Sequence, residues 1–332
     1  MTSTFTGFRL HAPERGGQAP ALRKETLSLE DLSAGDTVIK VAFAGVNYKD
    51  ALAATGQGKI IRRYPRIGGI DLSGRVVSSA APGLAPGDEV VVHGYGLGVD
   101  HDGGYAQYAR VRGEWVMPLP AGISLIDAAT LGTAGYTAGL ALHCMEHNGL
   151  EPAKGPVAVS GATGGAGGIA IDILSRRGYE VTAVSGKADD CRDYLASLGA
   201  KDVIAPPDFG AAAPLAHARW AGCVDAVGGP MLAWMLGATQ SEGVVAAFGN
   251  AGGNELSTTV FPFILRGVKL LGINANSPMD VRREVWAKLA TVYRPARLQA
   301  IRRTIALDGL PDAVASMLAR RSHGRIVIDM SL

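Results

Sequence analysis

The sequence predicts an α/β protein with two domains, the first mostly antiparallel β-structure and the second built on a doubly wound parallel sheet. Its 332 residues are enough for two hydrophobic cores. Up to about residue 125 the chain reads as short strands broken by turns. From about Ser124 strand-like and helix-like runs alternate, which is typical of a parallel sheet covered by helices. The apolar content of 47% and the charged content of 19% are those of a globular enzyme.

The β-rich domain is predicted from four runs. Residues 37–43 partly alternate between apolar and polar side chains, as a half-buried strand does. A Pro-Gly turn at 85–88 precedes the apolar run 89–93, and residues 105–111 continue the β pattern. The tail at 324–329 is again strand-like, and we expect it to return to the first domain.

The second domain opens with a predicted helix, because Ser124 and Asp127 have the spacing of a capping box. Ser277 and Pro278 open another helix, with Ser as the N-cap and Pro as the first helical residue, which ends near Tyr293. Six strand-like runs are expected to share one parallel sheet: 157–159, 181–184, 202–205, 223–227, 244–248 and 269–273.

A glycine-rich turn at residues 160–168 joins the first of these strands to a helical pattern that begins at Ile169. Such a turn presents unpaired backbone N–H groups at the positive end of a helix, where a pyrophosphate can bind close to the backbone. A glycine pattern alone is weak evidence, and a purely structural turn is the alternative. The strand at 181–184 follows at the distance of one βαβ unit, which favours a dinucleotide site.

The tip of that second strand predicts which dinucleotide binds. It reads Ser185-Gly186-Lys187, without the carboxylate that accepts hydrogen bonds from the adenosine ribose in NAD-binding folds. Lys187 would attract a 2′-phosphate, so NADP(H) is favoured over NAD(H). Asp189 and Asp190 are interpreted as the acidic first turn of the next helix.

Composition excludes several classes of partner. A net charge of +2 without a run of basic residues argues against nucleic acid. No apolar stretch reaches the ~18 residues of a membrane span, so no membrane partner is expected. Cys144, Cys191 and Cys223 are scattered and odd in number, which fits buried thiols in a reducing cytoplasm.

One motif is typical of a different class of enzyme. Residues 143–147 read His-Cys-Met-Glu-His, the pattern of the inverted zinc peptidases. The alternative is an ordinary helix whose histidines lie at the surface or are satisfied locally, and a dinucleotide fold leaves the motif no catalytic role.

The chain resembles the medium-chain dehydrogenase/reductase superfamily over essentially its whole length. Within it, the chain is similar to the acryloyl-CoA reductase branch, once grouped with the quinone oxidoreductases. The segments that carry this resemblance are 47–52 (NYKDAL), 58–62 (GKIIR), 69–74 (GIDLSG), 132–138 (GTAGYTA), the glycine-rich turn, 185–187, 258–266 (TTVFPFILR) and Gly324-Arg325. The resemblance implies a GroES-like catalytic domain, residues 1–127 completed by 298–332, and a Rossmann NADP-binding domain, residues 128–297.

The resemblance also implies the binding residues. It places the nicotinamide near Tyr48 and Thr133. The other expected cofactor contacts are Thr163, Gly164, Gly165 and Ala166 at the phosphates, Ser185, Gly186 and Lys187 at the 2′-phosphate, and Asn250, Ile264 and Ala275 on the nicotinamide side. The chain departs from relatives at Pro206-Pro207, where an Arg is common, so cofactor affinity is left open.

No catalytic metal is expected. Zinc enzymes of the superfamily use a Cys near position 47 and a Gly-His-Glu block, whereas this chain has Asn47 and Gly69-Ile70-Asp71. Without thiolate and imidazole ligands there is no tetrahedral zinc site. Hydrogen bonds must then handle the polarity of the substrate, which suits reduction of a C=C bond conjugated to a carbonyl.

Tyr48 and Asn47 are the candidate catalytic residues. The Tyr48 hydroxyl stays protonated at neutral pH and could donate a proton, or its ring could be a shelf under the nicotinamide. Asn47 could orient the loop, and Asp50 is interpreted as a structural hydrogen-bond acceptor. A basic cluster of Lys59, Arg62, Arg63 and Arg66 follows, in which Arg62 and Arg63 are the candidates for binding the phosphates of a CoA thioester. The alternative for the cluster is a solvated basic loop.

We therefore expect a cytoplasmic, zinc-independent enzyme that uses NADPH to reduce the C=C bond of short 2-enoyl-CoA thioesters, with acryloyl-CoA giving propanoyl-CoA as the leading case. The alternatives are an NADPH:quinone oxidoreductase and, more remotely, a non-enzymatic NADPH-binding or RNA-binding protein. A homodimer is expected from the habit of the family and from the predicted edge strand at 269–273.

Overall fold

The computed structural model describes residues 4–14, 17, 19–209 and 215–332 and contains two compact units. Unit 1 is Met1–Thr133 with Arg302–Leu332, and unit 2 is Ala134–Ile301. The boundary falls inside helix α2 (Leu125–His147), next to Gly132, whose backbone is not helical. The described part of the chain has no helix that is long and apolar enough to cross a membrane.

Unit 1 is built on two sheets. The first has the strand order β2-β1-β4, and the second has the order β15-β16-β3-β5-β6-β8 with β7 also paired to β3. The strands are β1 (Phe5–His11), β2 (Ala21–Leu27), β3 (Thr37–Val46), β4 (Arg66–Ile67), β5 (Asp71–Ser79), β6 (Glu89–His93), β7 (Tyr108–Val111), β8 (Met117–Pro118), β15 (Arg302–Ala306) and β16 (Arg325–Asp329). Its helices are α1 (Tyr48–Ala54) and α9 (Leu310–Leu318), with 3-10 turns at Leu29–Asp31, Gln57–Lys59, Gly113–Trp115 and Leu307–Gly309.

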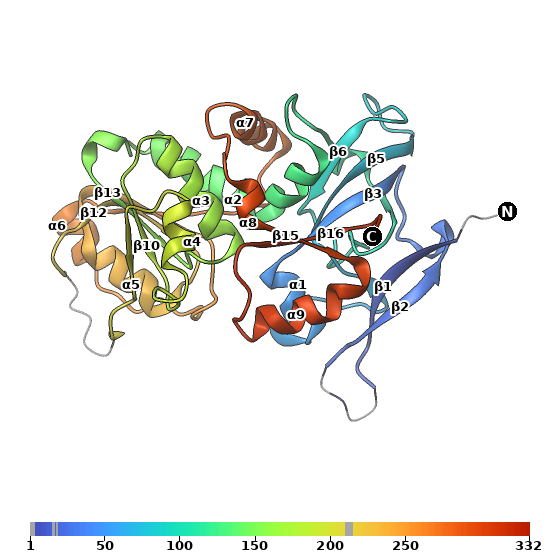
Figure 1. The fold of residues 1–332 in the computed structure, drawn as a ribbon, viewed down its shortest axis with the longest axis horizontal. Coiled ribbons are helices and arrows are strands. Elements are labelled where there is room, and N and C mark those ends of the chain that lie inside the picture. Colours follow the sequence, from blue (N-terminus) through green and yellow to red (C-terminus); the bar gives the residue numbers. More distant parts are fainter. Residues whose placement is uncertain (1–3, 15–16, 18, 210–214) are drawn as a thin grey trace. The chain divides into compact units, whose positions relative to one another are not determined.

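The C-terminal strand belongs to unit 1, as the sequence predicts. β16 pairs antiparallel with β3, with Ile326 opposite Val46 (Figure 1). The predicted strand at 105–111 is shorter than expected and begins only at Tyr108. The reason is that residues 105–107 are hydrogen-bonded to β1: the Phe8 N–H donates to the carbonyl oxygen of Tyr105, and the Gln107 N–H donates to that of Thr6.

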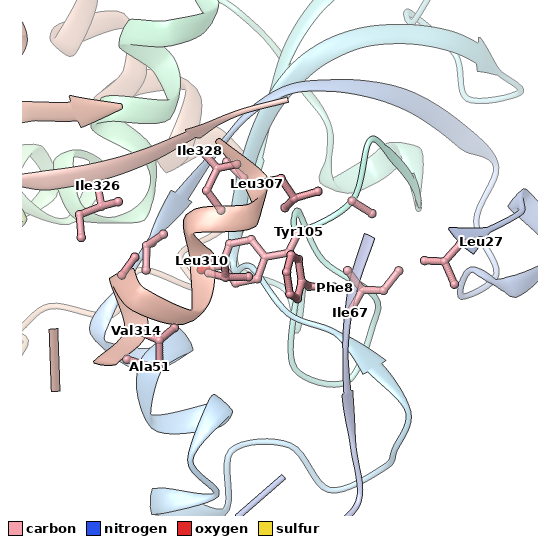
Figure 2. Close-up of a cluster of buried hydrophobic side chains, with 14 of the residues drawn as sticks. Phe8, Leu27, Ala51, Ile67, Tyr105, Leu307, Leu310, Val314, Ile326 and Ile328 are labelled. Atoms are coloured by element: carbon pink, nitrogen blue, oxygen red, sulfur yellow. The ribbon is translucent and has the colours of Figure 1, made fainter. Parts of the chain in front are cut away.

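The core of unit 1 lies between α1, α9 and the strands. Leu310 and Val314 of α9 point toward Ala51 of α1 and toward the rings of Tyr105 and Phe8 (Figure 2). Ile326 and Ile328 of β16 complete the cluster from the other end of the chain. The amphipathic spacing of α9 therefore buries one face against residues that precede it by more than 200 positions.

Unit 2 is a six-stranded parallel sheet in the order β11-β10-β9-β12-β13-β14 among the described residues. The strands are β9 (Val157–Ser160), β10 (Val181–Val184), β11 (Asp202–Ile204), β12 (Trp220–Asp225), β13 (Thr239–Ala247) and β14 (Lys269–Gly272). The helices are α3 (Gly165–Arg176), α4 (Arg192–Ser197), α5 (Gly229–Ala238), α6 (Phe261–Arg266), α7 (Met279–Ala290) and α8 (Leu298–Ile301), with a 3-10 turn at Pro152–Lys154. All six predicted strands are present, and every residue of β9, β10 and β12 is buried, because a parallel sheet is covered on both faces.

Two predicted helix starts have different outcomes. The predicted role of Ser124 in capping α2 is confirmed, because its hydroxyl accepts a hydrogen bond from the Asp127 N–H; the Asp127 carboxylate in turn accepts from the Ser124 hydroxyl. Helix α7 begins at Met279 with Pro278 at the N-cap, one residue later than predicted, and ends at Ala290, before Tyr293. Ser277 does not cap this helix through its side chain, since its hydroxyl is hydrogen-bonded to the Tyr136 hydroxyl.

Candidate functional site

The glycine-rich turn lies where the sequence predicts it, between β9 and α3 at the carboxyl edge of the sheet in unit 2. Gly164 is the N-cap of α3, and the first turn of that helix contains no acidic residue. A Cβ at Gly167 would collide with the carbonyl oxygen of Gly161, so only glycine lets the helix approach the turn this closely. A twelve-residue helix that begins here offers its N-terminal N–H groups to an anion.

The sheet order reverses at this point, because β9 lies between β10 on one side and β12 on the other. The Ser160 hydroxyl, at the end of β9, donates to Asp225 Oδ1 at the end of β12 over 2.5 Å and accepts from the Ala226 N–H over 3.0 Å. Asp225 also accepts hydrogen bonds from the N–H groups of Val227 and Gly228, and burial raises its pKa. This buried pair fixes the spacing of the two strands where an open α/β sheet forms its crevice. Sequence reasoning missed Asp225, although an Asp that ends an apolar strand before Gly-Gly was the available signal.

Residues 185–187 form a turn directly after β10, at the place where the sequence predicts the tip of this strand. Ser185 is buried and its hydroxyl accepts the Lys187 N–H over 3.0 Å, which folds the tip into a tight turn. Gly186 is exposed, and a Cβ there would meet nothing within 4 Å. Asp189 and Asp190 do not open α4 as predicted, because they lie exposed in the turn before it, and its first turn contains Asp193 instead.

The three residues expected on the nicotinamide side lie on different elements of unit 2. Asn250 follows the carboxyl end of β13 and Ala275 follows the carboxyl end of β14. Ile264 is on α6, which is tied by Arg266 to the carbonyl groups of Gly237 and Thr239 at the amino end of β13. Ile264 is 68% exposed, and its assignment to the nicotinamide stays a prediction.

In unit 1 the candidate residues converge on Asp71, the first residue of β5. Asp71 is fully buried and forms an ion pair with Arg325 of β16 at 3.3 Å. Its carboxylate also accepts hydrogen bonds from the Gly45 N–H, the Asn47 side-chain amide and the Thr133 N–H over 2.8–2.9 Å. One carboxylate therefore positions both Thr133 and the loop that precedes Tyr48.

Asn47 is fully engaged in this network. It is the N-cap of α1, its Nδ2 donates to Asp50 and Asp71, and its Oδ1 accepts from Arg325 Nη1 over 2.7 Å. Tyr48 begins α1 next to it and remains 39% exposed. The side chain of Asn47 thus orients the loop, whereas Tyr48 stays partly exposed to solvent.

Asp50 is a structural acceptor, as the sequence analysis interprets it. Its carboxylate accepts from the N–H groups of Asn47 and Ile70. Burial, together with the nearby charge of Asp71, raises the pKa of Asp50 to about 6.

Gly132 explains how Thr133 reaches Asp71. Its backbone has φ +45° and ψ −146°, which interrupts α2. A Cβ at this position would lie 2.6 Å from both Arg325 Nη2 and Asp71 Oδ2. Only glycine allows the helix backbone to approach the ion pair, and the kink directs the next N–H to the carboxylate.

The basic cluster is smaller than the sequence suggests. Lys59, Arg62 and Arg63 are exposed. Arg66 is instead paired with Asp102 at 3.3 Å and donates to the Ser33 hydroxyl, and only 11% of its side chain is exposed. Arg66 is therefore a structural residue, and Arg62 and Arg63 remain candidates for binding a phosphate.

The His-x-x-Glu-His motif forms a structural cluster in unit 2. Glu146 accepts hydrogen bonds from Arg177, Tyr179 and Tyr293, and His143 Nδ1 lies 2.7 Å from Lys288 Nζ. Within the described ranges no three His, Cys, Asp or Glu residues are placed to hold a metal ion. These contacts favour the interpretation as an ordinary helix.

The raised pKa of Asp50 predicts a pH-dependent stability. A carboxyl group whose pKa is higher in the folded than in the unfolded protein stabilises the fold below the unfolded value, and this contribution is lost as the pH rises through about 6. We expect the unfolding free energy of the wild type, relative to Asp50→Asn, to fall by about 2 kcal/mol between pH 4.5 and 7.5, at about 1.4 kcal/mol per pKa unit. Urea unfolding at several pH values measures it. Asp100→Asn, at an exposed position, is the control, and an equal difference at both pH values would contradict the prediction.

Comparisons with known proteins agree with this geometry. Residues 33–121 match the alcohol dehydrogenase GroES-like domain family, and residues 165–291 match the zinc-binding dehydrogenase family. The chain is 46% identical over 329 residues to the putative quinone oxidoreductase YhfP of Bacillus subtilis, covering 98% of this chain and 99% of that protein. A solved structure of Bacillus subtilis yhfP with NAD bound has a TM-score of 0.94, at 44% identity, with 99% of this chain and 100% of that chain covered.

Two further relatives are similar over nearly the whole chain. The acrylyl-CoA reductase AcuI of Ruegeria pomeroyi is 43% identical over 330 residues, which cover 98% of this chain and 99% of that protein. The yhdH oxidoreductase of Salmonella enterica, solved in complex with NADP, has a TM-score of 0.94 at 39% identity and covers 98% of this chain and 99% of that chain. The predicted fold class, a GroES-like domain with a Rossmann domain, is confirmed. The chain belongs to the medium-chain dehydrogenase/reductase superfamily of oxidoreductases, in the branch that contains the acrylyl-CoA reductases AcuI and the putative quinone oxidoreductase YhfP.

Proposed function

We propose that this protein is an NADPH-dependent reductase of the C=C bond in short 2-enoyl-CoA thioesters, with acryloyl-CoA as the leading substrate. The observation that carries the cofactor assignment is the carboxylate-free tip Ser185-Gly186-Lys187 beside the glycine-rich turn. The substrate assignment is supported by the 43% identity to a relative named acrylyl-CoA reductase.

The residues of unit 2 fit a dinucleotide phosphate. The turn Thr163, Gly164, Gly165 and Ala166 leads into α3 with no side chain larger than that of threonine, so phosphates could approach the backbone, and the N-terminal N–H groups of α3 would attract their negative charge. The Lys187 ammonium would pair with the 2′-phosphate, and Ser185 and Gly186 would leave room for it. Asn250 and Ala275 are the candidates at the nicotinamide half.

The chemistry would need little from the protein beyond positioning and proton transfer. When bound, the reduced nicotinamide supplies a hydride to the β-carbon of the enoyl thioester. Hydrogen-bond donors of the chain would stabilise the negative charge that develops on the thioester oxygen. The Tyr48 hydroxyl or a water molecule would then deliver a proton to the α-carbon. Asn47 would act by holding the loop, because its own amide is occupied by Asp50, Asp71 and Arg325.

A quinone is the second candidate substrate. It is favoured by the 46% identity to the putative quinone oxidoreductase YhfP. A small uncharged quinone would use the same cofactor site and would have no phosphates for Arg62 and Arg63 to bind.

We also propose a homodimer. β14 is the edge strand of its sheet among the described residues. Helix α6 and its N-cap residue expose four large apolar side chains. They are Val260, Phe261, Ile264 and Leu265, with 45–68% of each residue exposed. A second copy of this chain would cover this apolar surface and pair with the strand edge.

Replacement of the 2′-phosphate ligand tests the cofactor. A hydrogen bond to a charged group contributes about 1.5–3 kcal/mol, so Lys187→Ala should weaken NADPH binding roughly 10- to 100-fold and leave NADH binding almost unchanged. Titration calorimetry with both cofactors measures the difference. Lys201→Ala is the matched control, because it removes the same charge from another exposed position of unit 2, where the lysine pairs with Glu180. An equal loss for NADPH and NADH would mean that Lys187 does not bind the 2′-phosphate.

Tyr48→Phe separates the two roles of this residue. If the hydroxyl donates the proton, kcat should fall by ~10²-fold or more while NADPH binding is mostly kept. If the ring is only a shelf, Tyr48→Phe should keep kcat, and Tyr48→Ala should weaken NADPH binding. Steady-state rates and cofactor titrations on both variants decide between them.

The substrate class is tested by a side-by-side assay of NADPH oxidation with acryloyl-CoA, crotonyl-CoA and a benzoquinone. Changing Arg62 and Arg63 to Ala should raise the KM for acryloyl-CoA by roughly 5- to 30-fold at low salt, since each exposed charge contact contributes about 0.5–1 kcal/mol. Added salt should raise the wild-type KM as well, and quinone turnover should hardly respond.

Arg303→Ala, at an exposed position of β15, is the control for loss of positive charge. Quinone turnover far above that of every enoyl-CoA would move the assignment to the quinone oxidoreductase.

A further inference from the structure

The segment 274–277 lies at the carboxyl edge of the sheet in unit 2. It follows the end of β14 and precedes α7. A doubly wound sheet binds a dinucleotide across the point where the strand order reverses, which here lies between β9 and β12, with one half of the ligand over each half of the sheet. The tip of β10 takes the adenosine half in the proposed function, so the loops after β12, β13 and β14 are left for the nicotinamide half.

Arg282 anchors this segment through hydrogen bonds to its backbone. It is on α7 and only 2% exposed. Its Nη2 donates to the carbonyl oxygen of Ala275 over 2.8 Å, and its Nε donates to the carbonyl oxygen of Ser277 over 3.0 Å. A single planar guanidinium thus fixes two carbonyl groups of one short loop.

A second residue strengthens this anchor. The Arg282 guanidinium lies 5.6 Å from the ring centre of Tyr136, a fully buried residue of α2. The Tyr136 hydroxyl is hydrogen-bonded to the hydroxyl of Ser277. Within the segment, the Asn276 N–H donates to the side chain of Asn274 over 3.0 Å. The backbone of this segment is therefore held by two buried side chains, Arg282 and Tyr136, and cannot move without breaking their hydrogen bonds.

We propose that Arg282 is a positioning residue for the nicotinamide half of NADP(H), an inference that rests on the proposed function. By holding the carbonyl groups of Ala275 and Ser277, it sets the backbone against which the nicotinamide half binds, without touching the cofactor itself. The adenosine half binds at residues 163–166 and 185–187 and does not depend on Arg282. A lysine cannot replace it, because an ammonium lacks the rigid planar fork that reaches two carbonyl oxygens at once.

The test compares a whole cofactor with a fragment of it. Adenosine 2′,5′-bisphosphate carries the adenosine half and the 2′-phosphate but no nicotinamide. We expect Arg282→Lys to raise the Kd for NADPH by about 10-fold or more and to leave the Kd for the bisphosphate within about twofold, by titration calorimetry. Arg283→Lys, at an exposed position of the same helix, should change neither value.

Tyr136→Phe is the second variant, because it keeps the ring under the guanidinium and removes only the hydrogen bond to Ser277. Tyr136→Phe should weaken the binding of NADPH, by a smaller factor than Arg282→Lys, and should leave the binding of the bisphosphate unchanged. If Arg282→Lys does not fold, Tyr136→Phe tests the positioning role by itself. Equal weakening of both ligands, or no weakening of either, would overturn the positioning role. A wild type that binds neither NADPH nor the bisphosphate would overturn the proposed function itself.

Discussion

The buried carboxylate of Asp71 is the interaction on which unit 1 depends. A charge without access to water must be paired and hydrogen-bonded. Asp71 meets this requirement with Arg325, with the backbone N–H groups of Gly45 and Thr133, and with the side-chain amide of Asn47. These partners come from the end of β3, the cap of α1, the kink of α2 and the C-terminal strand. Satisfying one carboxylate therefore brings four separate segments to one point.

The same requirement shapes the residues around this point. Gly132 must be glycine because the guanidinium and the carboxylate occupy the space of a Cβ. Asn47 contributes both ends of its amide to the network, so its role is to orient the loop. Tyr48, one residue later, begins α1 next to this fixed cap and is 39% exposed. The network thus gives a rigid support to the residue that the proposed function uses for proton transfer.

In unit 2 the polar groups that need hydrogen-bond partners lie at the carboxyl edge of the sheet. Parallel strands end in loops whose backbone groups must be satisfied or must face a ligand. The Ser160–Asp225 pair ties the ends of β9 and β12, and Arg282 ties the segment after β14. The glycine-rich turn leads into α3, whose N-terminal N–H groups can attract an anion. The polar side chains of Ser160, Asp225 and Arg282 therefore hold loops of this edge in place.

The sequence by itself determined the features that depend on neighbouring residues. The six strands of unit 2, the turn at 160–168 and the tip Ser185-Gly186-Lys187 follow from hydrophobic runs and glycine spacing within short windows, and the structure has them in those places. The capping hydrogen bond of Ser124 and the hydrogen bond of Asp50 to the Asn47 N–H are likewise local, because each joins residues three positions apart. The resemblance to the superfamily added the GroES-like fold, which the strand pattern alone indicates only as a β-rich domain.

Only the tertiary structure decided the partners of the polar side chains. Arg325 and Asp71 are 254 positions apart, and Ser160 and Asp225 are 65 apart. No local pattern shows that such residues meet, because their contact depends on how strands and helices pack. For the same reason the sequence places Arg66 in a basic cluster, whereas in the structure it pairs with Asp102. Glu146 is part of a metal-binding pattern in the sequence, whereas in the structure it accepts hydrogen bonds from Arg177, Tyr179 and Tyr293. Local spacing determines which elements form, whereas long-range burial decides which of their charges remain available for chemistry.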